Sequence, residues 1–308
     1  MLLKTNVDIP IDSIKINFDS EGLWILNIAL AIIMFGVALS IKIDDFKLLI
    51  KKPKILFVGI FSQFFLLPAL TFVAILIIKP HPSFALGMMM IAACPGGNIS
   101  NFFSKMANGN AALSVSLTAF ATLICIIMTP FNLQFYGGLY EPTNAILKTV
   151  ELDPFSLFKL VLLILGVPLI LGMLTNIYFE ETAKKIEKKL KPFSMIIFLA
   201  LIVIAVYDNL DIFLNYIHLV AGLVIFHNIG AYCIGFYTAK TFGLEKRDRK
   251  TISMETGIQN GGLGLLLIFQ FFDGLGGMAL FAAFWSIWDI FSGLVLATFW
   301  TKDNKQLK

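Results

Sequence analysis

The sequence predicts an all-α polytopic membrane protein with nine transmembrane helices, and composition, segment length and charge distribution support this prediction. Of the 308 residues, 58% are hydrophobic and 14% are charged, and the mean hydropathy is +0.84. Soluble domains are about 45–50% apolar and about 25% charged. Apolar stretches of about 20 residues, enough to cross a hydrocarbon core roughly 30 Å thick, recur along the chain. We therefore expect one integrated helical bundle in a lipid bilayer.

Charged and turn-rich clusters divide the apolar sequence into its expected spans. The spans are expected at residues 22–41, 55–78, 83–104, 110–133, 155–178, 193–215, 217–239, 251–271 and 276–300. Residues 1–21 carry six charges and lack the basic-then-apolar order of a signal peptide. We therefore expect a polar tail at 1–21, a transmembrane domain at 22–300 and a second tail at 301–308.

Lysine and arginine residues are distributed unevenly between the two sets of loops. When the N-terminus is placed outside, nineteen of the 24 basic residues fall on the inner side. The positive-inside rule therefore predicts a multi-pass protein of the cell (inner) membrane, with the N-terminus outside and the C-terminus in the cytoplasm. Because the basic residues separate apolar runs instead of forming a patch, the expected partner is the bilayer and not nucleic acid. A monomer is the simplest expectation.

The third span contains an interruption at residues 94–101, Cys-Pro-Gly-Gly-Asn-Ile-Ser-Asn. Proline removes a backbone donor and crowds the preceding turn, and two glycines favour departure from helical geometry. Backbone groups freed in this way cost several kcal/mol each in lipid, so the break must face protein or a water-filled cavity. Pro95 alone would favour a kink healed by a neighbouring helix. The adjacent Asn98, Ser100 and Asn101 favour a built polar break instead.

The eighth span contains a second interruption at residues 255–264, Glu-Thr-Gly-Ile-Gln-Asn-Gly-Gly-Leu-Gly. An ionised carboxylate in the middle of a bilayer costs at least about 2.5 kcal/mol, so Glu255 needs a partner. No lysine or arginine lies within the spans at a comparable depth. A bound cation or a proton is therefore expected at Glu255.

The type of cation follows from the groups near the two interruptions. Hydroxyls, carboxamides, one carboxylate and freed carbonyls are hard oxygen ligands, and no Cys or His pair has metal-ligand spacing. A single carboxylate among neutral oxygens suits sodium best, with a proton as the second choice. In the fourth span Ser114 and Thr118 are four residues apart and share a helix face. Their hydroxyls can face the ion or bond back to their own helix.

Other polar residues inside the spans carry weaker signals. Gln63 lies five residues before Pro68 at a similar depth, and alone it is equally well explained as a contact between helices. His227 and Asn228 are weaker candidates, and His227 is expected to make a packing contact. Asp289 is expected to pair across the bundle or to lie near an aqueous path.

Two interrupted spans that enter from opposite sides are typical of an inverted-repeat secondary transporter. Spans one to four and six to nine can then be paired, and the fifth is left unmatched. This organisation predicts a transporter and not an enzyme. An intramembrane aspartyl protease is the other class considered, because 207–208 is Tyr-Asp and 68–70 is Pro-Ala-Leu. Its second motif is absent, since 273–276 reads Asp-Gly-Leu-Gly with the acid on the wrong side.

At these residues the sequence resembles the bile acid:sodium symporter family over nearly the whole chain. The matching runs are 94–101, the Leu-Ser-Val-Ser-Leu-Thr run at 113–118, Gln63 before Pro68, and Glu-x-Gly-x-Gln-Asn at 255–260. The resemblance implies a panel domain (spans 1, 5 and 6) packed against a core domain (spans 2–4 and 7–9), with the two broken helices crossing near the midplane. It also implies that the chain lacks the first of ten helices, which explains the unmatched fifth span.

The resemblance further implies two sodium ions, bound behind the crossing. The first site would use Ser100, Asn101, Ser114, Thr118 and Glu255. The second would use Gln63, Gln259, Glu255 and backbone carbonyls near Thr256 and Ile258. Substrate would meet the crossing at Asn98, Ile99, Asn260 and Gly261. The family often has Thr at the position of Asn98 and a small residue at that of Ile99, so bile-acid specificity transfers less well than sodium binding.

These observations lead to one mechanistic hypothesis. Sodium neutralises Glu255 and orders both helix breaks, an organic anion binds at the crossing, and alternating access carries both inward. The anion is expected to be bile-acid-like or a smaller carboxylate. The alternative is a proton-coupled organic anion transporter or exporter, because one buried carboxylate can also carry a proton.

Overall fold

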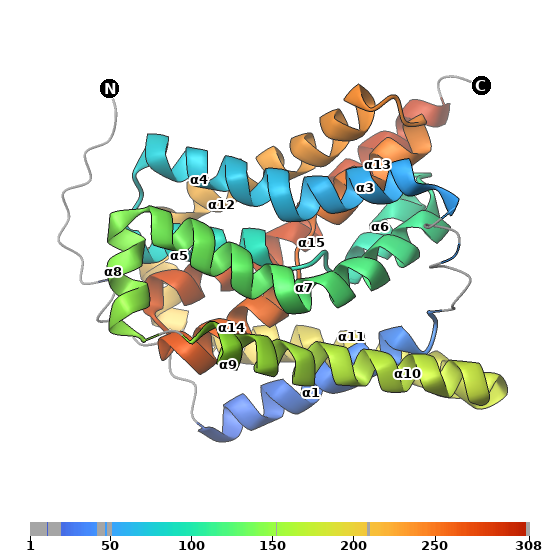
Figure 1. Ribbon diagram of the computed structural model, residues 1–308, viewed down its shortest axis with the longest axis horizontal. Coiled ribbons are helices and arrows are strands. Elements are labelled where there is room, and N and C mark those ends of the chain that lie inside the picture. The colour runs from blue at the N-terminus through green and yellow to red at the C-terminus, as the bar shows by residue number, and fades with distance from the viewer. Residues whose placement is uncertain are drawn as a thin grey trace.

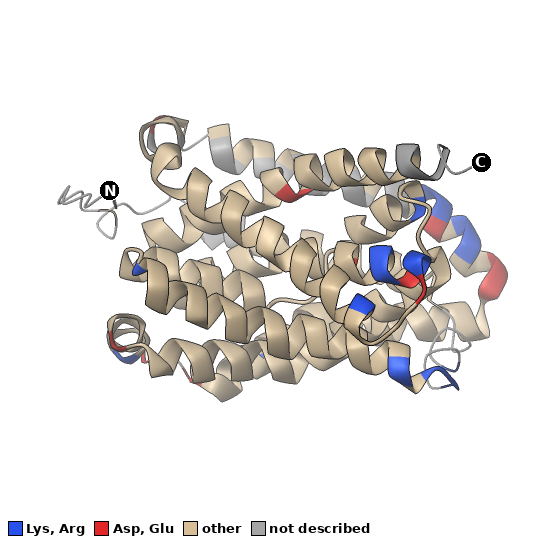
Figure 2. Ribbon diagram, turned by 90° about the horizontal axis from the view of Figure 1, so that it is seen from above, with Lys and Arg blue, Asp and Glu red and all other residues tan. Residues whose placement is uncertain are grey.

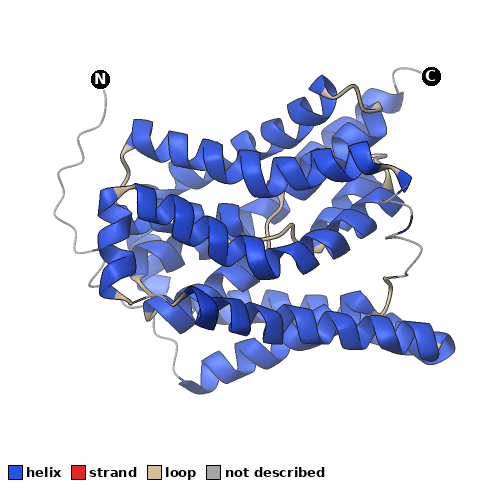
Figure 3. Ribbon diagram, viewed as in Figure 1, coloured by secondary structure: helices blue, strands red, loops and turns tan. Residues whose placement is uncertain are grey.

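The computed structural model describes residues 11, 20–41, 47, 51–151, 153–207 and 210–305, and these residues form an all-helical bundle (Figures 1 and 3). Within the described chain the only bridge of β type joins Gly96 to Gln259. The first half contains α1 (Ser20–Ala38), α3 (Pro53–Phe61), α4 (Leu67–Ile78), α5 (Pro82–Ala93), α6 (Ile99–Met106), α7 (Ala111–Leu139) and α8 (Glu141–Thr149). The second half contains α9 (Pro154–Val161), α10 (Val167–Tyr178), α11 (Glu180–Tyr207), α12 (Leu210–Thr241), α13 (Lys246–Gly257), α14 (Gly261–Phe272) and α15 (Gly276–Lys305).

Five helices of the described chain are long and apolar enough to cross a membrane. They are Pro53–Ile78, Ala111–Leu139, Pro154–Tyr178, Leu214–Thr241 and Gly276–Thr301. Three shorter apolar helices, Trp24–Ala38, Pro82–Ala93 and Gly261–Phe272, lie at other expected spans. The chain is therefore a polytopic helical membrane protein.

The expected boundaries around the sixth span are wrong. The basic stretch expected as a loop before residue 193 is helical, because α11 already begins at Glu180. Its first turns carry Lys184, which forms ion pairs with Glu180 and Glu181 at 3.2 and 3.3 Å. α12 begins at Leu210 and not near residue 217. Asp208 and Asn209, the two residues between α11 and α12, lie outside the described residues, and averaging hydropathy over this stretch does not distinguish them.

Each of two spanning helices contains a π-helical turn just before a proline. The turn η2 (Ser62–Leu66) joins α3 to α4 ahead of Pro68, and η3 (Leu162–Gly166) joins α9 to α10 ahead of Pro168. Proline has no N–H for the carbonyl four residues earlier, which for Pro68 is that of Phe64. The Asn132 side chain of α7 donates to this carbonyl at 2.9 Å. The lost backbone bond is thus replaced between helices, as burial in lipid requires.

The helices pack in two groups. α1, α10 and α11 contact one another along one side of the bundle (Figure 1). On the other side α5 packs on α7 and α15, and α12 packs along α13. The largest buried cluster runs through α5, α14 and α15, where side chains such as Met88, Leu266 and Phe281 are fully covered. This dense apolar core surrounds the two places where helices break.

Both expected interruptions are confirmed. The third span divides into α5 and α6 between Ala93 and Ile99, and the eighth divides into α13 and α14 between Gly257 and Gly261. The connecting segments appear as loops in the interior of the bundle in Figure 3.

Lys250 ties α13 to two neighbouring elements. It is 1% exposed, and its ammonium donates to the carbonyls of Ala107 and Trp300 at 3.0 and 3.1 Å. We expect Lys250→Met to lower the free energy of unfolding by about 1–3 kcal/mol, because both carbonyls lose a charged donor. Thermal unfolding in detergent measures this loss. Lys184→Met, at an exposed site, is the control, and equal midpoints for the two variants would contradict the prediction.

Candidate functional site

The two helix breaks are paired with each other by antiparallel backbone hydrogen bonds. The Gly97 N–H donates to the Ile258 carbonyl, and the Asn260 N–H donates to the Pro95 carbonyl, both at 2.8 Å. Each extended segment thus provides hydrogen-bond partners for backbone groups of the other segment. In a continuous helix these groups would have bonded within the helix itself. The breaks form one unit, although they are far apart in sequence.

Glycine is required where the segments meet. A Cβ on Gly97 would lie 2.8 Å from the Gln259 carbonyl oxygen. A Cβ on Gly96 would overlap the carboxylate of Glu255 and lie 3.0 Å from its backbone oxygen. Real Cβ atoms essentially never approach backbone atoms closer than 3.0 Å, so a side chain at Gly97 would displace the Gln259 backbone, and one at Gly96 would displace the Glu255 carboxylate.

Side chains from the surrounding helices satisfy the carbonyls freed at the end of α5. Thr129 of α7 donates to the Ala93 carbonyl at 2.7 Å. Gln63, in the π-helical turn η2, donates to the Cys94 carbonyl at 2.9 Å. Asn228 of α12 donates to the Gly257 carbonyl at 2.8 Å, which serves the second break in the same way. The buried position of Asn228 is therefore explained by its hydrogen bond to the backbone of the second break.

Two helices begin at the crossing, so their positive ends face it. Asn260 caps α14 by accepting from the Leu263 N–H at 3.0 Å. Asn98 precedes α6 without capping it, and its amide lies 3.9 Å from the Met34 sulfur of α1. Gly261 lies against Ser286, and Ile99 packs partly buried beside Phe103. Of the four residues predicted to meet substrate, Asn98 thus faces the α1 group of helices.

Glu255 lies directly behind the crossing and is 4% exposed. Its Oε2 accepts from Ser100 at 2.7 Å and lies 3.0 Å from the Thr118 hydroxyl. Thr118 also lies 3.2 Å from the Asn101 side-chain oxygen and 3.0 Å from the Ser114 carbonyl. One hydroxyl proton therefore serves three acceptors. The structure brings all five residues of the first predicted site together.

Two details differ from a simple ring of hydroxyls around Glu255. The Ser114 side chain donates to Ser104 Oγ at 3.1 Å, so only its carbonyl faces Thr118. The Oε1 atom of Glu255 is buried without a hydrogen-bond partner. A buried charged oxygen without a partner is costly. This cluster therefore has more acceptor oxygens than donors.

The residues of the second predicted site also lie together. Gln63 donates to the Gln259 side chain at 2.7 Å, and Gln259 donates to the Thr256 carbonyl at 2.6 Å. The Thr256 hydroxyl is buried without a partner. The Ile258 carbonyl already accepts from Gly97, which leaves one lone pair. Within the described chain no hydrogen bond joins Glu255 to either glutamine, so Glu255 is linked to this cluster by its position next to Thr256 in the sequence.

The chemistry of both clusters is that of hard, neutral oxygens around one carboxylate. Such ligands suit alkali and alkaline-earth cations and not thiophilic metals. Among the described residues no group of three or more His, Cys, Asp or Glu gathers to hold a metal. A monovalent cation fits the partnerless Oε1 of Glu255 and the partnerless Thr256 hydroxyl.

The remaining polar candidates have other surroundings. His227 bonds to the Thr71 hydroxyl at 2.6 Å and packs edge-on against Trp285, as expected for a packing contact. Asp289 of α15 is 3% exposed, and its carboxyl faces the backbone N–H of Gln259. Asp289 thus lies near the second break, on a different helix from its own.

Known proteins match this chain over most of its length. The model of the sodium bile acid symporter family matches residues 27–216. The chain is 32% identical to an uncharacterized sodium-dependent transporter, YocS, of Bacillus subtilis, over 94% of this chain and 88% of that protein. The chain belongs to the sodium bile acid symporter family. It is also 29% identical to a probable chloroplastic sodium/metabolite cotransporter, BASS1, of Arabidopsis thaliana, over 91% of this chain and 68% of that protein.

Membership in the sodium bile acid symporter family makes the chain a sodium-dependent membrane transporter and not an enzyme, which excludes the protease alternative. The human ileal sodium/bile acid cotransporter is 29% identical over 77% of this chain and 66% of its own length. The bacterial relative indicates the cell membrane as the location. The resemblance inferred from the broken spans is thereby confirmed.

Three polar residues on the helices around Glu255 were not predicted from the sequence. Ser104 follows Ser100 by four residues on α6, Asn110 precedes Ser114 by four on α7, and Thr251 precedes Glu255 by four on α13. All three take part in hydrogen bonds between these helices. Their four-residue spacing was the signal that could have found them.

Proposed function

We propose that this protein is a sodium-coupled symporter of an organic anion. The observation that carries the proposal is the excess of acceptor oxygens around Glu255, whose Oε1 is buried without a partner. A cation neutralises the carboxylate and accepts the lone pairs that one Thr118 proton cannot satisfy. We propose sodium as that cation, because the chain belongs to a family of sodium-dependent transporters.

Two sodium ions are proposed, one for each cluster. The first is held by Ser100, Asn101, Thr118, the Ser114 carbonyl and Glu255. The second is held by Gln63, Gln259, the Thr256 and Ile258 carbonyls and Glu255, beside the partnerless Thr256 hydroxyl. Sharing Glu255 between two ions lets one buried negative charge offset half of their combined positive charge.

The anion is proposed to bind where α6 and α14 begin. Their N-terminal amides and positive dipole ends suit a carboxylate or sulfonate. Asn98, Ile99, Asn260 and Gly261 would contact it, and Asn98 already faces α1. A bile-acid-like anion or a smaller carboxylate fits this chemistry.

Alternating access is proposed between the two groups of helices. The group of α1, α9–α10 and α11 corresponds to the panel, and the remaining spans, with both breaks, correspond to the core. Most described lysines and arginines gather at one end of the bundle (Figure 2). We place this basic end in the cytoplasm, with nine spans in inverted halves and the N-terminus outside.

Uptake into proteoliposomes tests the proposal. A labelled bile salt and labelled small carboxylates are offered with an inward sodium gradient, or with choline in place of sodium at fixed pH. We expect accumulation of at least one anion only with sodium, and a Hill coefficient above one for sodium. If uptake is equal in choline and follows a pH gradient instead, the coupling ion is a proton and not sodium.

A further inference from the structure

A polar seam runs from Glu255 toward the basic end of the bundle. One set of polar residues is Asn110, the N-cap of α7, with Ser114 and Thr118 on α7, and the other is Asp248, Thr251 and Glu255 on α13. Steps of three and four residues place each set on one helix face. α6 adds Ser104 to the space between these faces. Apolar side chains also join the two helices, because Leu113 and Ile252 belong to one buried cluster.

Hydrogen bonds connect the seam step by step. From Glu255 it passes through Thr118 to the Ser114 carbonyl, and Ser114 bonds to Ser104. The Ser114 N–H donates to the Asn110 carbonyl at 3.0 Å. The Thr251 hydroxyl lies 3.3 Å from the same carbonyl and accepts from the Asn110 N–H at 2.8 Å. Ser104, Ser114 and Thr251 are fully buried. Oxygen atoms thus follow one another from the site behind the crossing to the end of α13.

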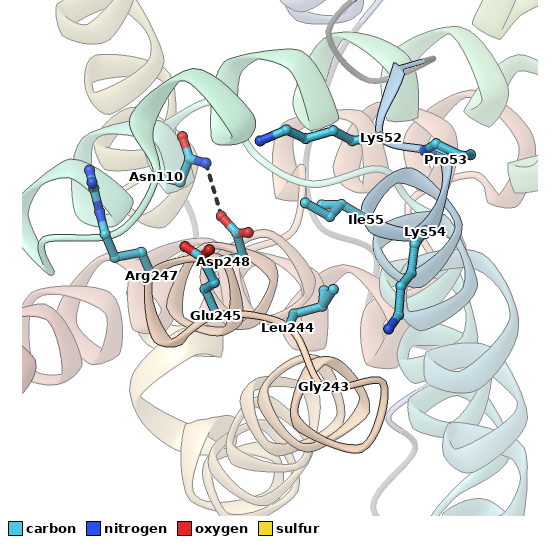
Figure 4. Close-up of a pocket in the computed structure, with 10 residues that line it drawn as sticks. All are labelled: Lys52, Pro53, Lys54, Ile55, Asn110, Gly243, Leu244, Glu245, Arg247 and Asp248. Carbon is cyan, nitrogen blue, oxygen red and sulfur yellow. Dashed lines mark hydrogen bonds between the residues drawn. The ribbon is translucent and has the colours of Figure 1, made fainter.

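The seam ends at a cavity of about 440 Å³ where α3, α7 and α13 begin (Figure 4). Asp248 lies at the junction, 6% exposed, and one of its oxygens accepts from the Asn110 amide at 2.9 Å. Lys52, Lys54 and Arg247 also line the cavity, but they are exposed. Within the described chain no ion pair joins Asp248 to these cations. The buried charge at the junction is therefore negative, and the positive charges lie at its rim.

We propose that sodium leaves Glu255 along this seam and that Asp248 is a second, transient cation-binding residue at its mouth. The proposal rests on the proposed function, because it needs sodium at Glu255. Asp248 lowers the energy of a cation emerging between buried oxygens, and the rim lysines then repel it into solvent. An anion held by the rim lysines is the other occupant that the same cavity could take.

The test is a sodium concentration jump applied to the basic end of the protein in proteoliposomes on a solid-supported membrane. The resulting charge displacement needs no transported anion. We expect Asp248→Asn to slow this relaxation about threefold to tenfold at low ionic strength, with the difference fading in concentrated choline chloride. The equilibrium sodium affinity from thermal stabilisation is expected to stay unchanged. Asparagine keeps the oxygen that accepts from Asn110.

Glu245→Gln is the matched control, because Glu245 lines the same cavity but is exposed. Thr251→Val is expected to slow the relaxation at every ionic strength, since it removes an oxygen inside the seam. Three results would each overturn the proposal: equal slowing by Glu245→Gln, slowing by Asp248→Asn that does not depend on salt, or a relaxation rate that changes when sulfate replaces chloride at constant sodium. Absence of any sodium-driven displacement or stabilisation in the unmodified protein would instead overturn the proposed function.

Discussion

Replacing Glu255 by glutamine is expected to remove the stabilisation of the protein by sodium. Glutamine keeps the size of the side chain and an oxygen that can accept from the Ser100 and Thr118 hydroxyls, but it offers no negative charge to a cation. A hydrogen bond or contact to a charged group contributes about 1.5–3 kcal/mol, which corresponds to roughly 10- to 100-fold in sodium affinity. Both proposed ions are affected, because both share this carboxylate.

The measurement is the thermal unfolding midpoint of the purified protein across sodium chloride concentrations, with choline chloride keeping the ionic strength constant. The unmodified protein is expected to gain stability with sodium, and Glu255→Gln is expected to gain none. Glu141→Gln, an exposed change in the first turn of α8, controls for loss of an acid. Retention of the sodium response in Glu255→Gln would show that the ion binds elsewhere.

Gly96→Ala is expected to abolish sodium-dependent uptake, although it adds a single methyl group. The new Cβ would overlap the Glu255 carboxylate and press on the Glu255 carbonyl, so the paired breaks must separate or Glu255 must move. Overpacking at such a site costs about 1–3 kcal/mol. Uptake in proteoliposomes and the sodium response of the unfolding midpoint measure the two consequences separately.

The matched control is Gly138→Ala in α7. A Cβ there meets no atom within 4 Å, and alanine favours the helix by about 0.5–1 kcal/mol over glycine. We expect Gly138→Ala to keep uptake and to unfold at the same or a higher temperature. If Gly96→Ala keeps uptake and the sodium response as Gly138→Ala does, the close approach of Gly96 to Glu255 is not required for transport.

The positions of the helix breaks could be predicted from sequence because their causes are local. Pro95, with two glycines after it, cannot continue a helix, and Glu255 cannot stay unpaired in a membrane. The boundary between α11 and α12 could not be predicted from hydropathy, because two polar residues at 208–209 are averaged into an apolar stretch.

Contacts between side chains and distant helices could not be predicted from the local sequence. The bond from Asn132 to the Phe64 carbonyl and the contact of Asp289 with the second break depend on how distant helices align. For the same reason the sequence could place Ser114 on the correct helix face but not show that its hydroxyl bonds to Ser104. Spacing along one helix predicts a face, whereas the partner of that face is set by the whole fold.

The pairing of the two breaks also has a thermodynamic consequence. Because Gly97 bonds to Ile258 and Asn260 to Pro95, neither break can be ordered or loosened without the other. Ligands on opposite sides of this pairing therefore share one conformational equilibrium. If sodium raises the affinity for the anion by some factor, the anion must raise the affinity for sodium by the same factor. Two short backbone segments thus convert two separate sites into a reciprocal pair, in which measuring one affinity with and without the other ligand gives both coupling constants.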